Sequence, residues 1–172
     1  MKTEMMKMLS TSANDIARVG GGWASLTPQD IAAALAGLPD GPYLLGMAAH
    51  VIDGGCRVLL ITYIRGRYRV PPVGGTGLDP VEAIVDLCLD ELWGDNMCGS
   101  CGGTKVTHEQ QQCPICKGRG HKQQSDLSRA KKARIPVEQW GAYKGFYERL
   151  YTQFTDWGAQ IGSHLARRLS SE

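Results

Sequence analysis

Two pairs of closely spaced cysteines constrain this chain more than any other feature. Each pair has the form Cys-x-x-Cys: Cys98 with Cys101, and Cys113 with Cys116. Two intervening residues allow both sulfurs of a pair to reach one metal ion, and the glycines that follow permit a tight turn that directs backbone N–H groups at the sulfurs. Four thiolates complete a tetrahedron and leave no position for water. The pattern therefore predicts one structural Zn²⁺ held by these four cysteines.

The cysteines have other possible roles. The N-terminal residues contain no continuous apolar core of the kind found in secretory signals, so we expect the chain to stay in the cytoplasm, where disulfides are rare. His108 and His121 lie close to the pairs in sequence and could replace one sulfur ligand. Cys56 and Cys88 lie in apolar surroundings and are expected to be core residues.

Residues 43–64 form the most apolar stretch of the chain and approach the length that spans a bilayer. They include His50, Asp53 and Arg57, and charged groups at the centre of a membrane are costly. We therefore expect no membrane span, but two short buried helices around a Gly-Gly turn at residues 54–55.

The spacing of apolar and capping residues predicts a mainly α-helical chain. Thr27 and Pro28 start a helix that a run of Gly and Pro over residues 37–42 ends. Further helices are predicted over residues 79–93 and 126–133, and the longest over residues 137–169. The longest helix carries apolar residues at steps of three and four: Trp140, Tyr143, Phe146, Tyr147, Leu150, Phe154, Trp157, Ile161, Leu165 and Leu169.

Composition and charge divide the chain into four segments. We predict a flexible N-terminal segment (1–26), a helical body (27–97), a zinc-binding module (98–120), and a segment with a helix-turn-helix second half and the long C-terminal helix (121–172). Residues 1–97 carry 7 Lys or Arg against 11 Asp or Glu, whereas residues 98–172 carry 12 against 6. This asymmetry favours a polyanion or an acidic partner for the second half, although small domains often carry uneven charge.

Residues 126–150 have the spacing of a helix-turn-helix, whose second helix lies in the major groove of DNA. Leu127 and Ala130 would face inward, Ile135 would be buried in the turn, and Trp140 would anchor the second helix. An ordinary helical hairpin with a solvated basic face is the alternative. The exposed positions that would open the second helix are Val137, Glu138, Gln139, Ala142 and Lys144. The predicted DNA contacts are Arg129, Lys131, Lys132, Arg134, Gln139, Lys144 and Arg149.

No catalytic arrangement competes with this interpretation. The loop over residues 74–77 is rich in glycine but does not lead into a helix with a lysine, as a phosphate-binding loop would. We therefore expect a protein that is not an enzyme and has no small-molecule substrate.

Beyond these patterns, the chain resembles the lambdoid phage late antitermination proteins of the Q family. The resemblance rests on the cysteine pairs, the Ser-Arg-Ala-Lys helix that follows, the Ile-Pro turn, the Trp and Tyr-Lys of the next helix, and the HLARRL sequence near the end. Gly22-Trp23 and the Asp30-Ile31 stretch add to it. The cysteine-rich region of DnaJ chaperones has similar Cys-x-x-Cys units, but only Cys116-Lys-Gly-Arg-Gly fits that form here, and a J-domain His-Pro-Asp is missing.

The resemblance implies a function. Proteins of the Q family bind promoter-proximal double-stranded DNA, join bacterial RNA polymerase and suppress pausing and termination so that late genes are transcribed. Their zinc module is inserted within the helix-turn-helix region, and the long last helix would be a scaffold that can contact polymerase. Two alternatives remain. One is a zinc-knuckle chaperone or adaptor that binds polypeptide through the aromatic face of the last helix, and the other is a simple DNA-binding transcription regulator.

Overall fold

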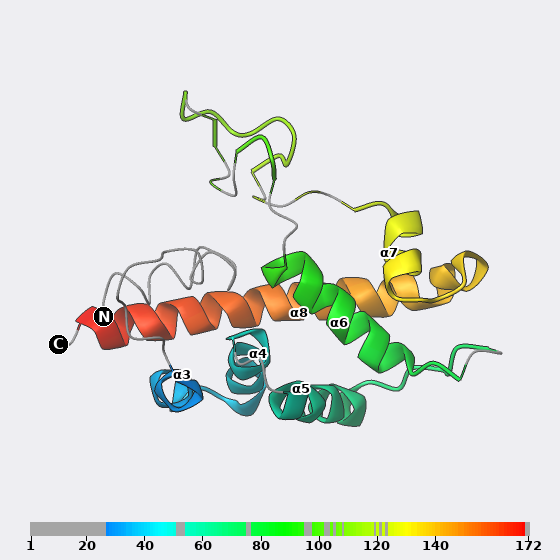
Figure 1. Ribbon diagram of the computed structural model, residues 1–172, viewed down its shortest axis with the longest axis horizontal. Helices are drawn as coiled ribbons and strands as arrows, with labels where there is room; N and C mark the ends of the chain where they lie inside the picture. Colours follow the sequence, from blue (N-terminus) through cyan, green and yellow to red (C-terminus); the bar gives the residue numbers. More distant parts are fainter. Residues whose placement is uncertain are drawn as a thin grey trace. The chain divides into compact units, whose positions relative to one another are not determined.

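A computed structural model describes residues 27–50, 54–74, 77–94, 98–101, 104, 106–107, 109–118, 120, 122 and 124–170 (Figure 1). The described part is mainly helical, as predicted, with six α-helices and no strand. The flexible segment predicted over residues 1–26 lies outside it. Numbered as in Figure 1, the helices are α3 (Pro28–Leu35), α4 (Asp40–His50), α5 (Gly54–Arg67), α6 (Pro80–Trp93), α7 (Asp126–Lys132) and α8 (Val137–Ser170).

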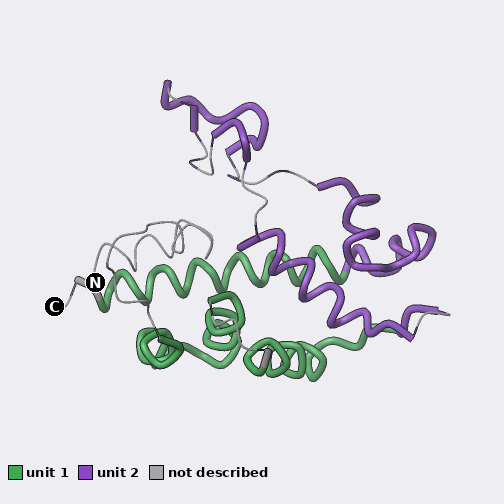
Figure 2. The backbone as a smooth tube through the Cα atoms, viewed as in Figure 1, with its two compact units in different colours: residues 1–71, 146–172 green, residues 72–145 purple. Residues whose placement is uncertain are grey.

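The chain divides into two compact units (Figure 2). The first contains the described residues up to Pro71 and those from Phe146 onwards, and the second is Pro72–Gly145. Helix α8 contributes to both, because its residues before Phe146 belong to the second unit. The predicted segments 27–97 and 121–172 therefore each supply residues to both units.

In the first unit, α3, α4 and α5 lie along one side of α8 (Figure 1). The predicted apolar face of α8 is buried from Trp140 to Leu165, while the side chain of Leu169 lies outside the described part. Trp157 is central, because its ring meets Tyr63 edge-on at 6.1 Å and stacks on Phe154 at 5.7 Å. Aromatic packing of this kind adds to the free energy gained from apolar burial.

Helix α4 begins earlier than the sequence suggested. Residues 37–42 were expected to form a loop, but α4 already starts at Asp40, with Gly41 and Pro42 in its first turn. A proline is tolerated there because the first N–H groups of a helix have no intrahelical acceptor. Gly41 also has a packing role, since a Cβ atom at this position would lie 2.5 Å from the ring of Trp157.

Helix α5 also departs from the prediction. Gly54 and Gly55 belong to its first turn and do not form the expected Gly-Gly turn between two helices, while residues 51–53 lie outside the described part. The helix continues past Ile64, the end of the apolar stretch, to Arg67, so that Arg65 and Arg67 lie in its last turn. Cationic side chains are favoured there by the helix dipole, and Arg67 in addition covers the ring of Tyr63 at 4.4 Å.

In the second unit, Asp79 caps α6 by accepting a hydrogen bond from the N–H of Val81, and Ser125 caps α7 in the same way through Ser128. The buried side of α6 includes Leu87 and Glu91, whereas Leu89 and Leu92 are only half-buried. No helix in the described part of the chain is long and apolar enough to cross a membrane.

Candidate metal centre and helical pair

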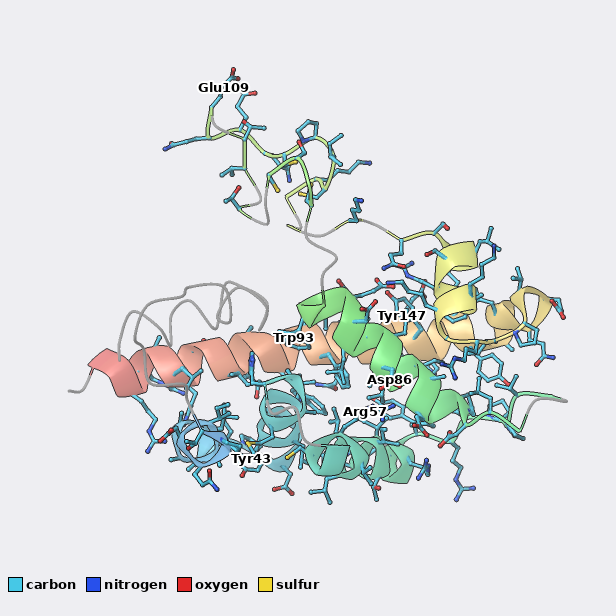
Figure 3. The ribbon with its side chains drawn as sticks, viewed as in Figure 1. Tyr43, Arg57, Asp86, Trp93, Glu109 and Tyr147 are labelled. Carbon is cyan, nitrogen blue, oxygen red and sulfur yellow. The ribbon has the colours of Figure 1, made fainter. Side chains whose placement is uncertain are left out.

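The four cysteines of the two pairs come together, as predicted. Their sulfurs lie within 4.8 Å of one another, and the side chains are buried. The sulfurs of Cys98 and Cys113 are 3.8 Å apart and those of Cys101 and Cys116 are 3.7 Å apart, far beyond the length of a disulfide of about 2.05 Å. This cluster can hold a metal ion. Its sulfur atoms gather in a small module whose outer turn carries Glu109 (Figure 3).

The spacing of the sulfurs matches a tetrahedral site. Four thiolates at about 2.3 Å from one ion have sulfur–sulfur separations of roughly 3.8 Å. Backbone N–H groups of Cys116 and Ile115 lower the pKa of the Cys113 thiol to about 6, with help from the neighbouring thiols and against the effect of burial. The thiolate is the form that binds metal, so this environment favours the ionised state in which Cys113 can bind a metal ion.

Short-range hydrogen bonds shape the module around the sulfurs. The N–H of Gly120 donates to the sulfur of Cys116 at 3.3 Å, and the N–H of Cys98 donates to the carbonyl of Gly120 at 2.9 Å. These bonds tie the end of the module to its beginning. Between the pairs, Val106 and Gln112 form an isolated antiparallel bridge. His108 and His121, the alternative ligands, lie outside the described residues.

Helices α7 and α8 are joined by a four-residue turn, residues 133–136, as the sequence predicted. The turn is a Schellman motif, in which the N–H of Ile135 donates to the carbonyl of Ala130 and the N–H of Arg134 donates to that of Lys131. Arg134 has a φ of 55°, in the left-handed region where glycine is usual. Ala130 and Ile135 are buried beside this turn, and Trp140 is buried in the next helix.

Leu127 is an exception to this agreement. It was expected to face inward, but 49% of it is exposed. The packed side of α7 carries Ala130, which is fully buried, and Arg129, which binds Glu91. Leu127 precedes Ala130 by three residues, which places it about 60° around the helix from Ala130, on the side away from Arg129.

The predicted DNA contacts fall into two groups. Some already bind groups of the protein itself. The guanidinium of Arg129 donates two hydrogen bonds to the carboxylate of Glu91, at 2.9 and 3.2 Å. Lys132 donates to Asp90 at 2.5 Å, and the side chain of Gln139 forms hydrogen bonds with the backbone of Gly74. Lys144 holds Asp126 and lowers the pKa of that carboxyl. Lys131 and Arg134 are exposed in the second unit, and Arg149 is exposed on the part of α8 that belongs to the first unit.

The sequence patterns did not identify the glutamate of this network. Glu91 is 5% exposed, and periodicity alone marked the apolar residues around it instead. Its partner Arg129 follows 38 residues later, on the far side of the cysteine module. A buried carboxylate needs a cation, but the sequence does not say which of several it binds.

The unusual backbone of Arg134 gives a prediction. An L-residue in the left-handed region costs roughly 1–2 kcal/mol, which exceeds the extra chain entropy of a glycine, about 0.5–1 kcal/mol. Arg134→Gly should therefore raise the free energy of unfolding by about 0.5–1 kcal/mol, a shift of about 1–4 °C in Tm for a chain of this size. Thermal denaturation measures it, with Arg134→Ala as the control that keeps the strained backbone. A lower Tm for the glycine variant than for the alanine variant would contradict this reading of the turn.

The chain matches no protein-family model, no curated protein and no solved structure. Its function is therefore inferred from the geometry of the metal centre and of the helical pair.

Proposed function

We propose that this protein is a zinc-containing, DNA-binding transcription antitermination factor of the phage Q type. It would act in the cytoplasm of a bacterial host cell, bind promoter-proximal double-stranded DNA and join RNA polymerase. The observation that carries the proposal is the α7–turn–α8 pair, with Ala130, Ile135 and Trp140 buried and a basic turn exposed. Burial of one residue in each helix and one in the turn is what fixes two helices of a helix-turn-helix against each other.

The exposed groups of this pair suit nucleic acid. Lys131 and Arg134 are exposed at the end of α7 and in the turn, where cations can reach phosphate oxygens. Val137, Glu138 and Ala142 are exposed at the start of α8, the part of a recognition helix that meets base edges. Val137 and Ala142 offer methyl groups of the kind that contact thymine.

The metal in this proposal is one Zn²⁺ with a structural role. Sulfur separations of 3.7 and 3.8 Å fit the tetrahedral thiolate geometry of zinc, and all four ligands come from protein, so no position remains for a reacting water. Zinc would fold the insertion between α6 and α7 and do no chemistry.

The adaptor alternative loses its binding surface. It required the aromatic face of the last helix to be available to a polypeptide, but Trp140, Tyr143, Phe146, Tyr147, Phe154 and Trp157 are buried, with at most 8% of each exposed. A simple DNA-binding regulator would use the same α7–α8 pair, and only an assay of transcription elongation distinguishes it from an antiterminator.

A salt titration of DNA binding tests the proposal. Changing Lys131 and Arg134 together to Ala removes two exposed cations beside the turn and should weaken binding to double-stranded DNA. The slope of log K against log salt should become shallower by about two units, since each phosphate contact contributes about 0.9. Lys132 is left unchanged because it already pairs with Asp90.

The matched control changes Arg65 and Arg69, exposed cations of the first unit, to Ala. It removes the same charge and should leave the slope unchanged. Equal slopes for the wild type and the Lys131/Arg134 variant would count against a DNA-binding role for this pair.

A further inference from the structure

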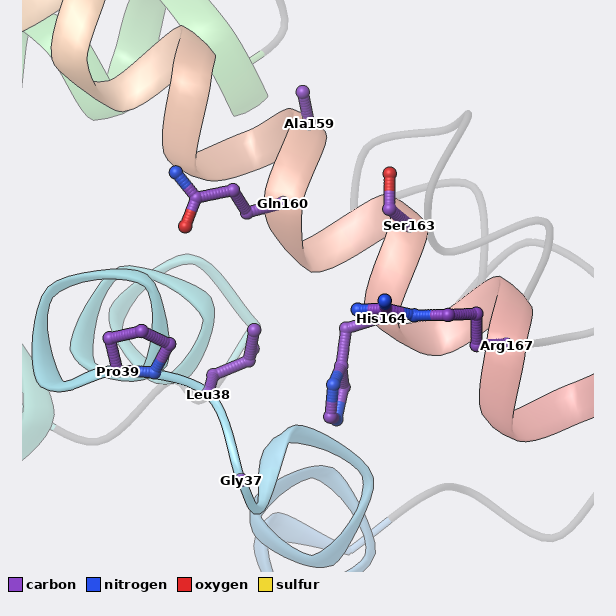
Figure 4. Close-up of a pocket in the computed structure, with 8 residues that line it drawn as sticks. All are labelled: Gly37, Leu38, Pro39, Ala159, Gln160, Ser163, His164 and Arg167. Atoms are coloured by element: carbon purple, nitrogen blue, oxygen red, sulfur yellow. The ribbon is translucent and has the colours of Figure 1, made fainter.

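A cavity of about 350 Å³ that is open to solvent lies within the first unit, between the turn that joins α3 to α4 and the C-terminal part of α8 (Figure 4). Ligand sites in proteins have volumes of roughly 300–1,000 Å³, so this one suits a small molecule. Its lining residues are Gly37, Leu38, Pro39, Ala159, Gln160, Ser163, His164 and Arg167.

His164 is the group that most needs a ligand. The ring projects from α8 toward the α3–α4 turn (Figure 4), and a Cβ atom on Gly37 would lie 3.7 Å from its Cε1. Its Nε2 is buried and has no hydrogen-bond partner among the described residues. Buried nitrogen atoms without a partner are rare in folded proteins, and each one calls for a bound water, ion or ligand as its explanation.

The charge of the lining selects the ligand. Arg167 and His164 supply cationic or donating nitrogens, Gln160 and Ser163 add donors, and none of the described lining residues is acidic. Helix α4 starts directly after Pro39, and the partial positive charge of a helix N-terminus adds to this potential.

The next residue of α8 is used differently. Arg168 donates to the carbonyls of Ala33, Ala34 and Ala36 at the end of α3, at 2.5, 3.2 and 3.4 Å. The negative end of the α3 dipole is thus met by Arg168, whereas Arg167 is among the residues that line the cavity.

We propose that this cavity binds a small molecule that bears an oxyanion, either a carboxylate or a phosphate monoester, and that the oxyanion accepts hydrogen bonds from His164 Nε2 and the Arg167 guanidinium. The site is separate from the metal centre and from the α7–α8 pair, and the proposal does not depend on the proposed function. Regulation of the protein by a small anionic ligand would be its consequence.

NMR of the imidazole nitrogens tests the site in the full-length, metal-loaded protein. Succinate and inorganic phosphate are titrated separately, with sodium chloride at matched ionic strength as the reference. We expect a saturable shift of the His164 nitrogens with one of the two, half-complete in the millimolar range or below. The probe that saturates identifies the source of the oxyanion.

Two variants complete the experiment. Arg167→Gln, measured by the same NMR titration, and His164→Gln, measured by isothermal titration calorimetry because it lacks the reporting ring, should each weaken binding by about tenfold or more, the loss expected for a charge-assisted hydrogen bond. His50→Gln, at the far end of α4 and not in the lining, should bind as the wild type does. A response of His164 to both probes that equals its response to chloride overturns the proposal, as does unchanged affinity in Arg167→Gln, whose folding is checked by circular dichroism.

Discussion

Replacing Cys113 with Ser should release the metal and unfold the cysteine module while the helices persist. The wild type should carry about one equivalent of zinc per chain, and the variant far less, because a tetrahedral site loses one of its four ligands. Structural zinc contributes an apparent binding free energy of roughly 10–16 kcal/mol in small zinc-binding domains, so the local effect should be large. All helices of the described part lie outside residues 98–120, and the helical circular dichroism should therefore be largely retained.

The readouts are metal analysis, circular dichroism and DNA affinity, compared with Cys56→Ser. Cys56 is half-buried in α5 and lies outside the cluster, so its variant should keep the metal. DNA affinity should fall in Cys113→Ser, because the module connects α6 to α7. Full zinc occupancy in Cys113→Ser would contradict the proposed ligand set, and a collapse of the helical signal would contradict a self-contained insertion.

The second large effect is expected at Arg129. Arg129→Met leaves the carboxylate of Glu91 buried without its cation, and breaking a buried pair in this way costs about 3–5 kcal/mol. The corresponding fall in Tm is about 6–20 °C for a chain of this size. Chemical and thermal denaturation measure it. The double variant Glu91→Met with Arg129→Met should recover most of the loss, since apolar side chains of similar volume can replace a buried pair.

Lys132→Met provides the matched comparison. Lys132 and Asp90 are paired on the same two helices as Arg129 and Glu91, but their side chains are 40% and 46% exposed. An exposed pair contributes about 0–1 kcal/mol, so this variant should lose little stability. Losses of similar size for Arg129→Met and Lys132→Met would show that burial does not distinguish the two pairs.

The result for Arg129 also bears on its predicted role. The sequence placed Arg129 in a row of cations suited to phosphate. In the structure, three of these cations form ion pairs within the protein: Arg129 with Glu91, Lys132 with Asp90, and Lys144 with Asp126. Lys131 and Arg134 are exposed members of that row outside these three pairs. Charge counts along a sequence do not reveal such pairing, because Asp90 and Glu91 precede the cysteine module whereas Lys132 and Arg129 follow it.

Local rules predicted much of the fold. These rules depend only on neighbouring residues. They cover the helix caps at Thr27, Asp79 and Ser125, the regular spacing of apolar residues along α8, and the Cys-x-x-Cys pairs, and each feature is seen in the structure. The misjudged positions depend on distant residues. Gly41 and Pro42 enter α4 because the backbone there packs against Trp157, more than a hundred residues away in sequence. Tertiary packing of this kind overrides the intrinsic helix propensity of Gly and Pro.

The same difference between features set by neighbouring residues and features set by distant residues applies to the candidate site. The cluster of four cysteines follows from two short motifs, whereas the exposure of Leu127 and the burial of Glu91 depend on which faces of α7 and α6 meet their neighbours. The cavity beside His164 has no motif at all, since its walls come from the α3–α4 turn and from a segment of α8 about 120 residues later.

The proposed function is tested most directly by transcription in vitro through an intrinsic terminator, with purified bacterial RNA polymerase and a template that carries a late-promoter region. The zinc-loaded protein should increase the fraction of transcripts that read through the terminator, and the Lys131/Arg134 double alanine variant should increase it less. An unchanged read-through fraction on a template that the protein binds would contradict antitermination and leave a simple DNA-binding regulator as the better account.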